Sequence, residues 1–263
     1  MIRSQGWLAL LTGLLLTGCN AFSPLSSPSG DAQLLSAARA AFDQGNYQQA
    51  INYYGQLSSS NSDTGLAESA YAEMTEAGAS MQAYAGAFGK GDVAIGPAIT
   101  AFAESMVPGS QAKRVAIWQA YNQAASIGDA NLKYLVKFLG SVSFAAEILA
   151  ESVPPNSTTL TQNDLSNIQI SATNFPTTAD SHGDYTLSTA VLSDVNVATP
   201  TYNMFNAAVF DLINDVDQLG DNGTFGANTL SFASQVTSNF HPTPTLTSVY
   251  IALLVSVGIG TTQ

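Results

Sequence analysis

The segment 36–57, SAARAAFDQGNYQQAINYYGQL, constrains the fold more than any other part of the chain. Its first half is rich in alanine, which has the highest helix propensity, and Gly45 supplies the left-handed residue that commonly ends a helix. After this glycine, apolar residues recur at spacings of three and four, as on one face of an amphipathic helix. The segment predicts two antiparallel helices joined by a tight turn, with an apolar face on the second helix made by Tyr47, Ala50, Ile51, Tyr54 and Leu57.

This hairpin resembles one tetratricopeptide repeat, because Gly45, Tyr47, Ala50 and Tyr54 stand at positions typical of that family. The resemblance covers a single repeat of about 34 residues. It implies that other helices stack on the hairpin, since one repeat cannot bury its own apolar face. Residues 66–86 lack a similar turn, so further repeats are degenerate. We expect an all-α fold in which hairpins of tetratricopeptide-like type pack into an irregular α-bundle; the alternative is an αα-hairpin of no particular family.

The same resemblance indicates a surface for a protein partner. Repeat proteins often line their concave face with aromatic side chains on which a peptide docks. Tyr53 lies one step off the apolar stripe of its helix, so we expect its ring to face outward. The expected partner-binding residues are Tyr47, Tyr53 and Tyr54.

The N-terminal segment has the features of a secretory signal. Arg3 precedes an apolar run at residues 7–16, which is too short to span a bilayer, and small residues follow it. The motif L-T-G-C at 16–19 resembles the lipobox of bacterial lipoproteins. This resemblance implies that residues 1–18 are a signal peptide that is removed, and that Cys19 becomes the acylated N-terminus. The alternative is an ordinary secretory signal with a chance cysteine.

Acylation of Cys19 would tie the protein firmly to a membrane, because one acyl chain gives marginal binding and a second makes anchoring stable. Palmitate is an expected component of this anchor. The next residue is Asn20 and not aspartate. By resemblance to the sorting rules of bacteria with two membranes, this residue implies an outer-membrane lipoprotein facing the periplasm, while inner-membrane or surface-exposed placement stays open.

The remaining chain divides at two changes in composition. Residues 19–31 are rich in Ser, Pro and Gly and predict a flexible tether. Residues 32–153 form the expected tetratricopeptide-like helical region. Residues 154–263 begin at a double proline, turn richer in Thr, Asn and Asp, and predict a C-terminal helical region that packs on the first. The predicted helices after the hairpin lie at 65–88, 97–106, 110–127, 130–152, 161–172, 199–219, 228–240 and 249–259.

The segment 130–152 predicts the longest helix, with Asp129 as its N-cap. This helix is apolar almost all round, so we expect it to be the central helix of the bundle. A membrane span is not expected here, because Lys133, Lys137 and Glu147 interrupt the apolar sequence.

The charge of the chain excludes two classes of partner. Seven Lys and Arg stand against 19 Asp and Glu, which gives a formal net charge of −12. Nucleic acids and anionic lipid headgroups are bound through basic surfaces, so neither is an expected partner. Cys19 is the single cysteine and forms no intramolecular disulfide.

No segment has the residue spacing of a catalytic or metal site. His182 lies in the loop 180–184 (D-S-H-G-D), but the members of a catalytic triad come from distant segments. The acidic residues at 215–222 do not fit the ligand positions of a calcium loop and predict a solvated helix end. The glycine-rich turn at 86–92 lacks the strand of a phosphate loop. The basic pair at 113–114 predicts a solvated helix start. We expect no enzyme, cofactor or metal.

Together these features predict a lipid-anchored scaffold or adaptor of the cell envelope, which holds an envelope protein through tetratricopeptide-like helices. Lipoproteins that look similar in architecture include the partners of tripartite periplasmic (TRAP) transporters, although shared architecture does not define function. The alternative is a periplasmic binder of a small apolar ligand, associated with transport, with its pocket among the Ala- and Gly-rich helices.

Overall fold

The computed structural model describes residues 28–88 and 95–161, together with Val195, Met204, Ala208, Asp211, Leu212, Asp215 and Gln218. Within these residues the chain is all-α, as predicted, and contains no strand. The α-helices are α2 (Asp31–Asp43), α3 (Tyr47–Tyr54), α4 (Ser62–Glu76), α5 (Met81–Phe88), α6 (Ile95–Met106), α7 (Gln111–Gln123) and α8 (Ala130–Ser152). Two 3₁₀ turns, η3 (Ser59–Asn61) and η4 (Ala124–Ser126), precede α4 and follow α7.

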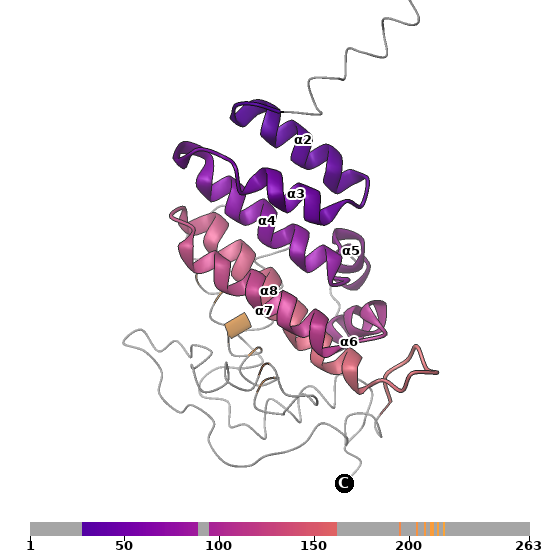
Figure 1. Cartoon of the computed structure of the whole chain (residues 1–263). Coiled ribbons are helices and arrows are strands. Elements are labelled where there is room, and N and C mark those ends of the chain that lie inside the picture. The colour runs from indigo at the N-terminus through magenta and orange to yellow at the C-terminus, as the bar shows by residue number, and fades with distance from the viewer. Residues whose placement is uncertain are drawn as a thin grey trace, which may run out of the picture.

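The helices form a stack. Figure 1 shows α2, α3 and α4 side by side, with α7 and α8 continuing below them, and each of these neighbours packs on the next. The short helices α5 and α6 pack against each other at one end, and α6 also packs on α8. Helices α5 and α6 thus separate α4 from α7 in sequence while these two pack together in space.

The predicted α2–α3 hairpin is confirmed. Gly45 has φ 77°, and the backbone N–H groups of Gly45 and Asn46 donate to the carbonyls of Phe42 (2.9 Å) and Ala41 (2.8 Å). This pair of bonds is the glycine-terminated Schellman motif, which satisfies carbonyls at a helix end. The two helices bury a small cluster between them, formed by Ala38, Ala41, Ala50 and Tyr54.

The prediction of one helix at 65–88 is wrong, because the chain forms two helices there. Helix α4 begins at Ser62 and ends at Glu76, and α5 begins at Met81. Gly78 has φ 108°, and the N–H groups of Gly78 and of the residue after it donate to carbonyls in the last turn of α4. The break is a second Schellman motif, which the alanine-rich flanks concealed.

The N-cap predicted for α8 is confirmed, and α7 begins with a similar cap. The Ser110 side chain accepts a hydrogen bond from the backbone of Lys113 at 3.3 Å, and the Asp129 carboxylate accepts one from the backbone of Leu132 at 2.9 Å. Both bonds satisfy donors that a helix start leaves free. Helix α8 spans Ala130–Ser152, which are the predicted bounds.

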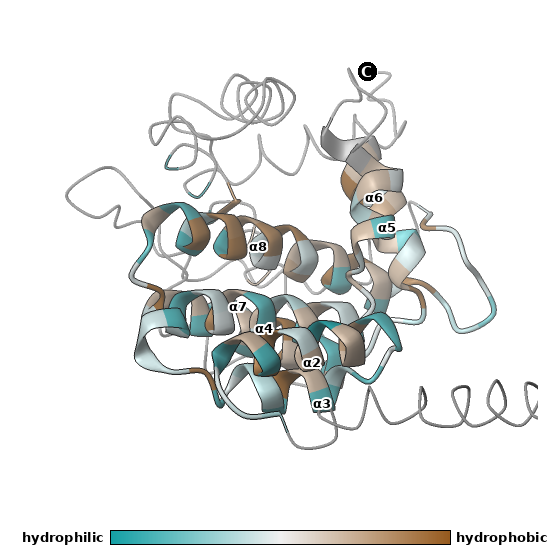
Figure 2. Ribbon diagram, turned by 90° about the horizontal axis from the view of Figure 1, so that it is seen from above, coloured by the Kyte–Doolittle hydropathy of each residue, from teal (hydrophilic) through white to brown (hydrophobic). Residues whose placement is uncertain are grey.

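Helix α8 is the central helix of the bundle, as expected. It packs against α4, α6 and α7, and every residue from Gly140 to Ala150 is buried. In Figure 2 hydrophobic residues recur along α8, whereas polar residues cover much of α2 and α3. A Cβ on Gly140 would lie 3.1 Å from two atoms of the Tyr121 side chain, so α7 and α8 approach closely there. Among the described residues, no helix combines the length and apolar character needed to cross a membrane.

Part of the C-terminal region belongs to the same core. Six residues within the predicted helix 199–219 are helical, and Met204, Ala208 and Leu212 are fully buried in the main hydrophobic cluster with α4, α6, α7 and α8. The other predicted elements after residue 161 lie outside the described residues, as do the signal peptide, Cys19 and both histidines.

Candidate functional site

The three tyrosines expected to bind a partner do not form one exposed patch. Tyr54 is only 4% exposed and lies in the α2–α3 cluster. Burial raises the pKa of the Tyr54 hydroxyl, and its contact with Glu68 of α4 adds to this shift. Tyr47 and Tyr53 are half-buried: Tyr47 packs edge-on against Phe42 with ring centroids 5.3 Å apart. The structure therefore uses Tyr54 to join α2, α3 and α4.

An open groove of about 400 Å³ lies next to these tyrosines, between α3, α4 and α7. Its walls come from α3, the C-terminal end of α4 and α7. The groove is lined by Gln48, Ile51, Glu73, Glu76, Ala77, Ala112, Lys113, Ala116 and Gln119. Because these residues come from three separate segments, sequence spacing carried no signal for the groove.

Two glutamates give the groove its acidic character, and a glutamine holds each of them. The side-chain amide of Gln48 donates to Glu76 at 2.6 Å, and that of Gln123 donates to Glu73 at 2.7 Å. Glu73 is half-buried, and this burial raises the pKa of its carboxyl group. The neighbouring charge of Glu76 raises the pKa further, whereas the hydrogen bond from Gln123 lowers it. The two carboxylates lie three residues apart on α4 and repel each other, while the hydrogen bonds from Gln48 and Gln123 hold their orientations.

Lys113 also lines the groove, but its charge is directed elsewhere. Its Nζ donates to the backbone carbonyls of Met106 at 3.1 Å and Pro108 at 2.7 Å. These carbonyls belong to the C-terminal end of α6 and the turn after it, where the helix dipole favours a positive charge. Lys113 therefore fastens the α6–α7 turn.

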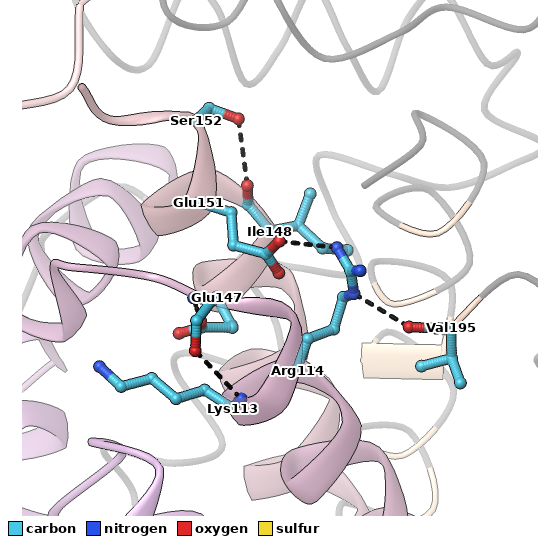
Figure 3. A network of polar contacts seen from close by, with 8 residues as sticks. Lys113, Arg114, Glu147, Ile148, Glu151, Ser152 and Val195 are labelled. Atoms are coloured by element: carbon cyan, nitrogen blue, oxygen red, sulfur yellow. Dashed lines mark hydrogen bonds and ion pairs between the residues drawn. The ribbon is translucent and has the colours of Figure 1, made fainter. Parts of the chain in front are cut away.

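A buried charge network lies under the N-terminal end of α7 (Figure 3). Arg114 is 0% exposed and donates from Nη1 to Glu151 at 2.8 Å and from Nε to the carbonyl of Val195 at 3.2 Å. Glu147 is also fully buried and accepts from the backbone N–H of Ser110 at 2.6 Å. The expectation of a solvated helix start at 113–114 is wrong for Arg114, because the helix turns this residue toward α8.

The network holds two carboxyl groups near one guanidinium. Burial raises the pKa of Glu147 to about 8 and that of Glu151 to about 7, although the adjacent Arg114 lowers the pKa of both. Within the described residues, Oε2 of Glu147 and Oε1 of Glu151 accept no hydrogen bond. Since Arg114 contacts Glu151 directly, we assign the retained proton at neutral pH to Glu147.

The proton on Glu147 predicts a pH-dependent stability. Its folded pKa lies above the ordinary value of 4.5, so its stabilising effect is complete below that value and is lost as the pH rises through about 8. The unfolding free energy of the wild type should therefore fall between pH 5 and pH 8, and this fall should be smaller in Glu147→Gln. For one proton the difference in slope is at most about 1.4 kcal/mol per pH unit.

Urea unfolding of the wild type and Glu147→Gln at pH 5, 6.5 and 8 measures this difference, because the amide keeps the acceptor for Ser110 without a titrating group. Glu76→Gln, at an exposed carboxylate, is the control. Parallel pH profiles for the wild type and Glu147→Gln would show that Glu147 is ionised throughout this range.

A second buried acidic set joins the C-terminal region to α7 and α8. Asp211 and Asp215 are each 1% exposed, and the Ser141 hydroxyl donates to Asp215 at 3.4 Å. Burial raises the pKa of the Tyr121 hydroxyl, and the neighbouring Asp215 and Asp211 add to the shift. The expectation of a solvated helix end is therefore wrong for Asp215, which lies one turn from Asp211 on the buried face.

The two buried acidic sets do not form a metal-binding group within the described residues. Across the described part of the chain, no group of three His, Cys, Asp or Glu side chains is placed to hold a metal ion. Their carboxyl groups bond to neighbouring segments: Glu147 accepts from the backbone of Ser110, Glu151 from Arg114 and Asp215 from Ser141. Among the described residues, the groove between α3, α4 and α7 offers room for another molecule.

Comparison with known proteins gives no family assignment. No protein-family model matches the chain, and no curated protein or solved structure is significantly similar to it. The function is therefore inferred from the groove and from the sequence features.

Proposed function

We propose that the protein is a lipid-anchored adaptor of the cell envelope that holds a segment of a protein partner in the groove between α3, α4 and α7. The observation that carries this proposal is the groove itself, which is open to solvent and bordered by three helices of the all-α stack. Helical-repeat proteins bind partners on surfaces of this kind. Tyr47 lies on α3 beside the groove residue Gln48, so the expected aromatic contacts and the groove share one helix.

The alternative is a binder of a small apolar ligand at the same place. The volume of about 400 Å³ falls within the range of ligand pockets, and Ile51, Ala77, Ala112 and Ala116 provide apolar wall. Small-molecule sites, however, usually enclose most of the ligand surface. The open shape and the two glutamates favour a chain segment that continues beyond the groove on both sides.

We propose further that Cys19 carries the lipid anchor that holds the protein on the outer membrane, facing the periplasm. The lipobox-like motif at 16–19 and Asn20 support this placement. The segment before α2 then serves as the tether between the lipid and the helical stack, which keeps the groove close to the membrane and accessible to envelope proteins.

Replacing Cys19 tests the anchor directly. We expect Cys19→Ser to abolish incorporation of labelled palmitate and to leave residues 1–18 attached, because lipobox processing follows modification of the cysteine thiol. Mass spectrometry of the protein N-terminus and metabolic labelling measure both effects, with Ser23→Ala as a matched control in the tether. A Cys19→Ser protein that is still labelled, or still cleaved before residue 19, would contradict the lipoprotein assignment.

Crosslinking in intact cells, followed by affinity purification and mass spectrometry, tests the adaptor function. We expect one envelope protein in near-equal amount with the adaptor, and a lower yield from Tyr47→Ala and Tyr53→Ala. Thermal unfolding of both variants shows whether the loss is local, since both rings also pack on the hairpin. Purification without any stoichiometric protein, but with a bound small molecule, would instead support the ligand-binding alternative.

A further inference from the structure

The acidic groove residues have no cationic partner among the described residues. The ion pairs found there are Arg39–Glu68 and Arg114–Glu151, and neither involves Glu73 or Glu76. An unpaired carboxylate is ordinary on an exposed surface, but Glu73 is half-buried and repels Glu76. A half-buried carboxylate near a like charge is stabilised when a cation approaches.

Among the described residues that line the groove, Lys113 is the single cation, and it does not serve this purpose. Lys113 Nζ donates to two carbonyls, of Met106 and Pro108, and is held at the end of α6. The two glutamates therefore give the groove an excess of negative charge. The groove volume of about 400 Å³ is large enough to hold several side chains.

We propose that the groove binds a basic segment of the partner protein, with a lysine or arginine side chain placed between Glu73 and Glu76. This inference rests on the proposed adaptor function and specifies the chemistry of the partner. The methylene groups of such a side chain can pack against the apolar lining residues Ile51, Ala77, Ala112 and Ala116, while the carboxylates bind its charged end.

The two carboxylates of the groove are preorganised for binding a cation. Gln48 and Gln123 fix the two carboxylates by hydrogen bonds, so less side-chain entropy is lost on binding than with free glutamates. The net charge of −12 attracts a basic segment from a distance and speeds its approach, whereas Glu73 provides the shorter-range and less screened contact.

The experiment uses the full-length protein in intact cells with a photoreactive amino acid at Gln119, an exposed groove residue, or at Gln33, an exposed residue of α2 outside the groove. The adduct formed at position 119 is sequenced. A synthetic peptide with this sequence is then titrated against the purified protein, beside a peptide whose Lys and Arg are replaced by Gln.

We expect an adduct at position 119 and not at 33, with at least one Lys or Arg in the crosslinked peptide. Glu73→Gln should weaken binding of the basic peptide about tenfold, as for loss of one hydrogen bond to a charged group. Glu76→Gln, which is more exposed, should weaken it about threefold. Asp43→Asn, an exposed carboxylate outside the groove, is the matched control and should change the dissociation constant by less than about twofold.

The outcomes separate this inference from the adaptor function. An adduct at position 119 whose peptide lacks Lys and Arg, or whose binding is the same in Glu73→Gln, Glu76→Gln and Asp43→Asn, overturns the basic-segment inference and leaves the adaptor in place. Absence of any protein adduct at position 119 overturns both. If Glu73→Gln unfolds, the exposed Glu76→Gln variant and the neutral peptide still decide the question.

Discussion

Arg114→Met is expected to lower the free energy of unfolding by about 3–5 kcal/mol at pH 8, the usual cost of removing one partner from a buried ion pair. Methionine fills much of the space of the arginine side chain but leaves the buried Glu151 without its cation and the carbonyl of Val195 without a donor. Among the described residues, no Lys or Arg then pairs with Glu147 or Glu151.

Chemical unfolding at pH 8 and pH 5 measures this effect. The loss should be smaller at pH 5, because Glu147 and Glu151 both bind protons more readily once Arg114 is gone. Lys113→Met removes the adjacent cation, whose two hydrogen bonds are nearer the surface, and is expected to cost at most about 1 kcal/mol. A loss below 1 kcal/mol for Arg114→Met at pH 8, or an equal loss at both pH values, would show that the network is not charged as described.

Gly109→Ala is expected to destabilise the protein by about 3 kcal/mol, at the upper end of the cost of overpacking. A Cβ at this position would lie 2.3 Å from the backbone nitrogen of Glu151 and 2.6 Å from the carbonyl carbon of Ala150. Both are backbone atoms of α8, so no side-chain rotation relieves the clash, and the α6–α7 turn must move away from α8.

Gly86→Ala is the matched control for this prediction. Within the described part of the chain, no heavy atom lies within 4 Å of a Cβ at Gly86, which is exposed on α5. Alanine is favoured over glycine within a helix, so this change should stabilise the protein by up to about 1 kcal/mol. Thermal unfolding of the two variants compares them, and a Gly109→Ala protein as stable as the wild type would mean that the turn does not lie against α8.

The elements that sequence predicted well are those with local signals. Gly45 ends α2 because a left-handed residue is needed there, and Asp129 caps α8 because its side chain reaches a backbone N–H three residues later. The 3.6-residue period also placed Tyr54 on the buried face of α3, although the resemblance to repeat proteins proposed the same ring as a contact residue. The local pattern was the better guide to this residue.

The elements that sequence missed depend on contacts between distant segments. Arg114 donates a hydrogen bond to Glu151, which lies 37 positions later in the chain, and Ser141 donates one to Asp215, which lies 74 positions later. Charge spacing within one helix does not show which face of it is covered by another. Glu147 illustrates this, because its ionisable side chain correctly argued against a membrane span, whereas its burial was unforeseen.

The groove was missed for the same reason. Its acidic residues lie at the end of α4, and that end is defined by the Gly78 break, which the alanine-rich sequence concealed. Helices α5 and α6 then separate α4 from α7 in the chain while the two pack together. Sequence predicted α3 as the partner-binding helix, and the structure shows that α4 and α7 border a groove together with it.

Filling the groove is the most direct test of the adaptor. Ala112→Trp places a large ring in the groove from an exposed position on α7, and Ala125→Trp places the same ring on the exposed η4 turn outside it. The measurement is the amount of partner protein recovered with each variant after crosslinking in intact cells. The adaptor account predicts that Ala112→Trp loses the partner while Ala125→Trp retains it at the wild-type ratio. Equal recovery with both variants would place the partner elsewhere and contradict the account.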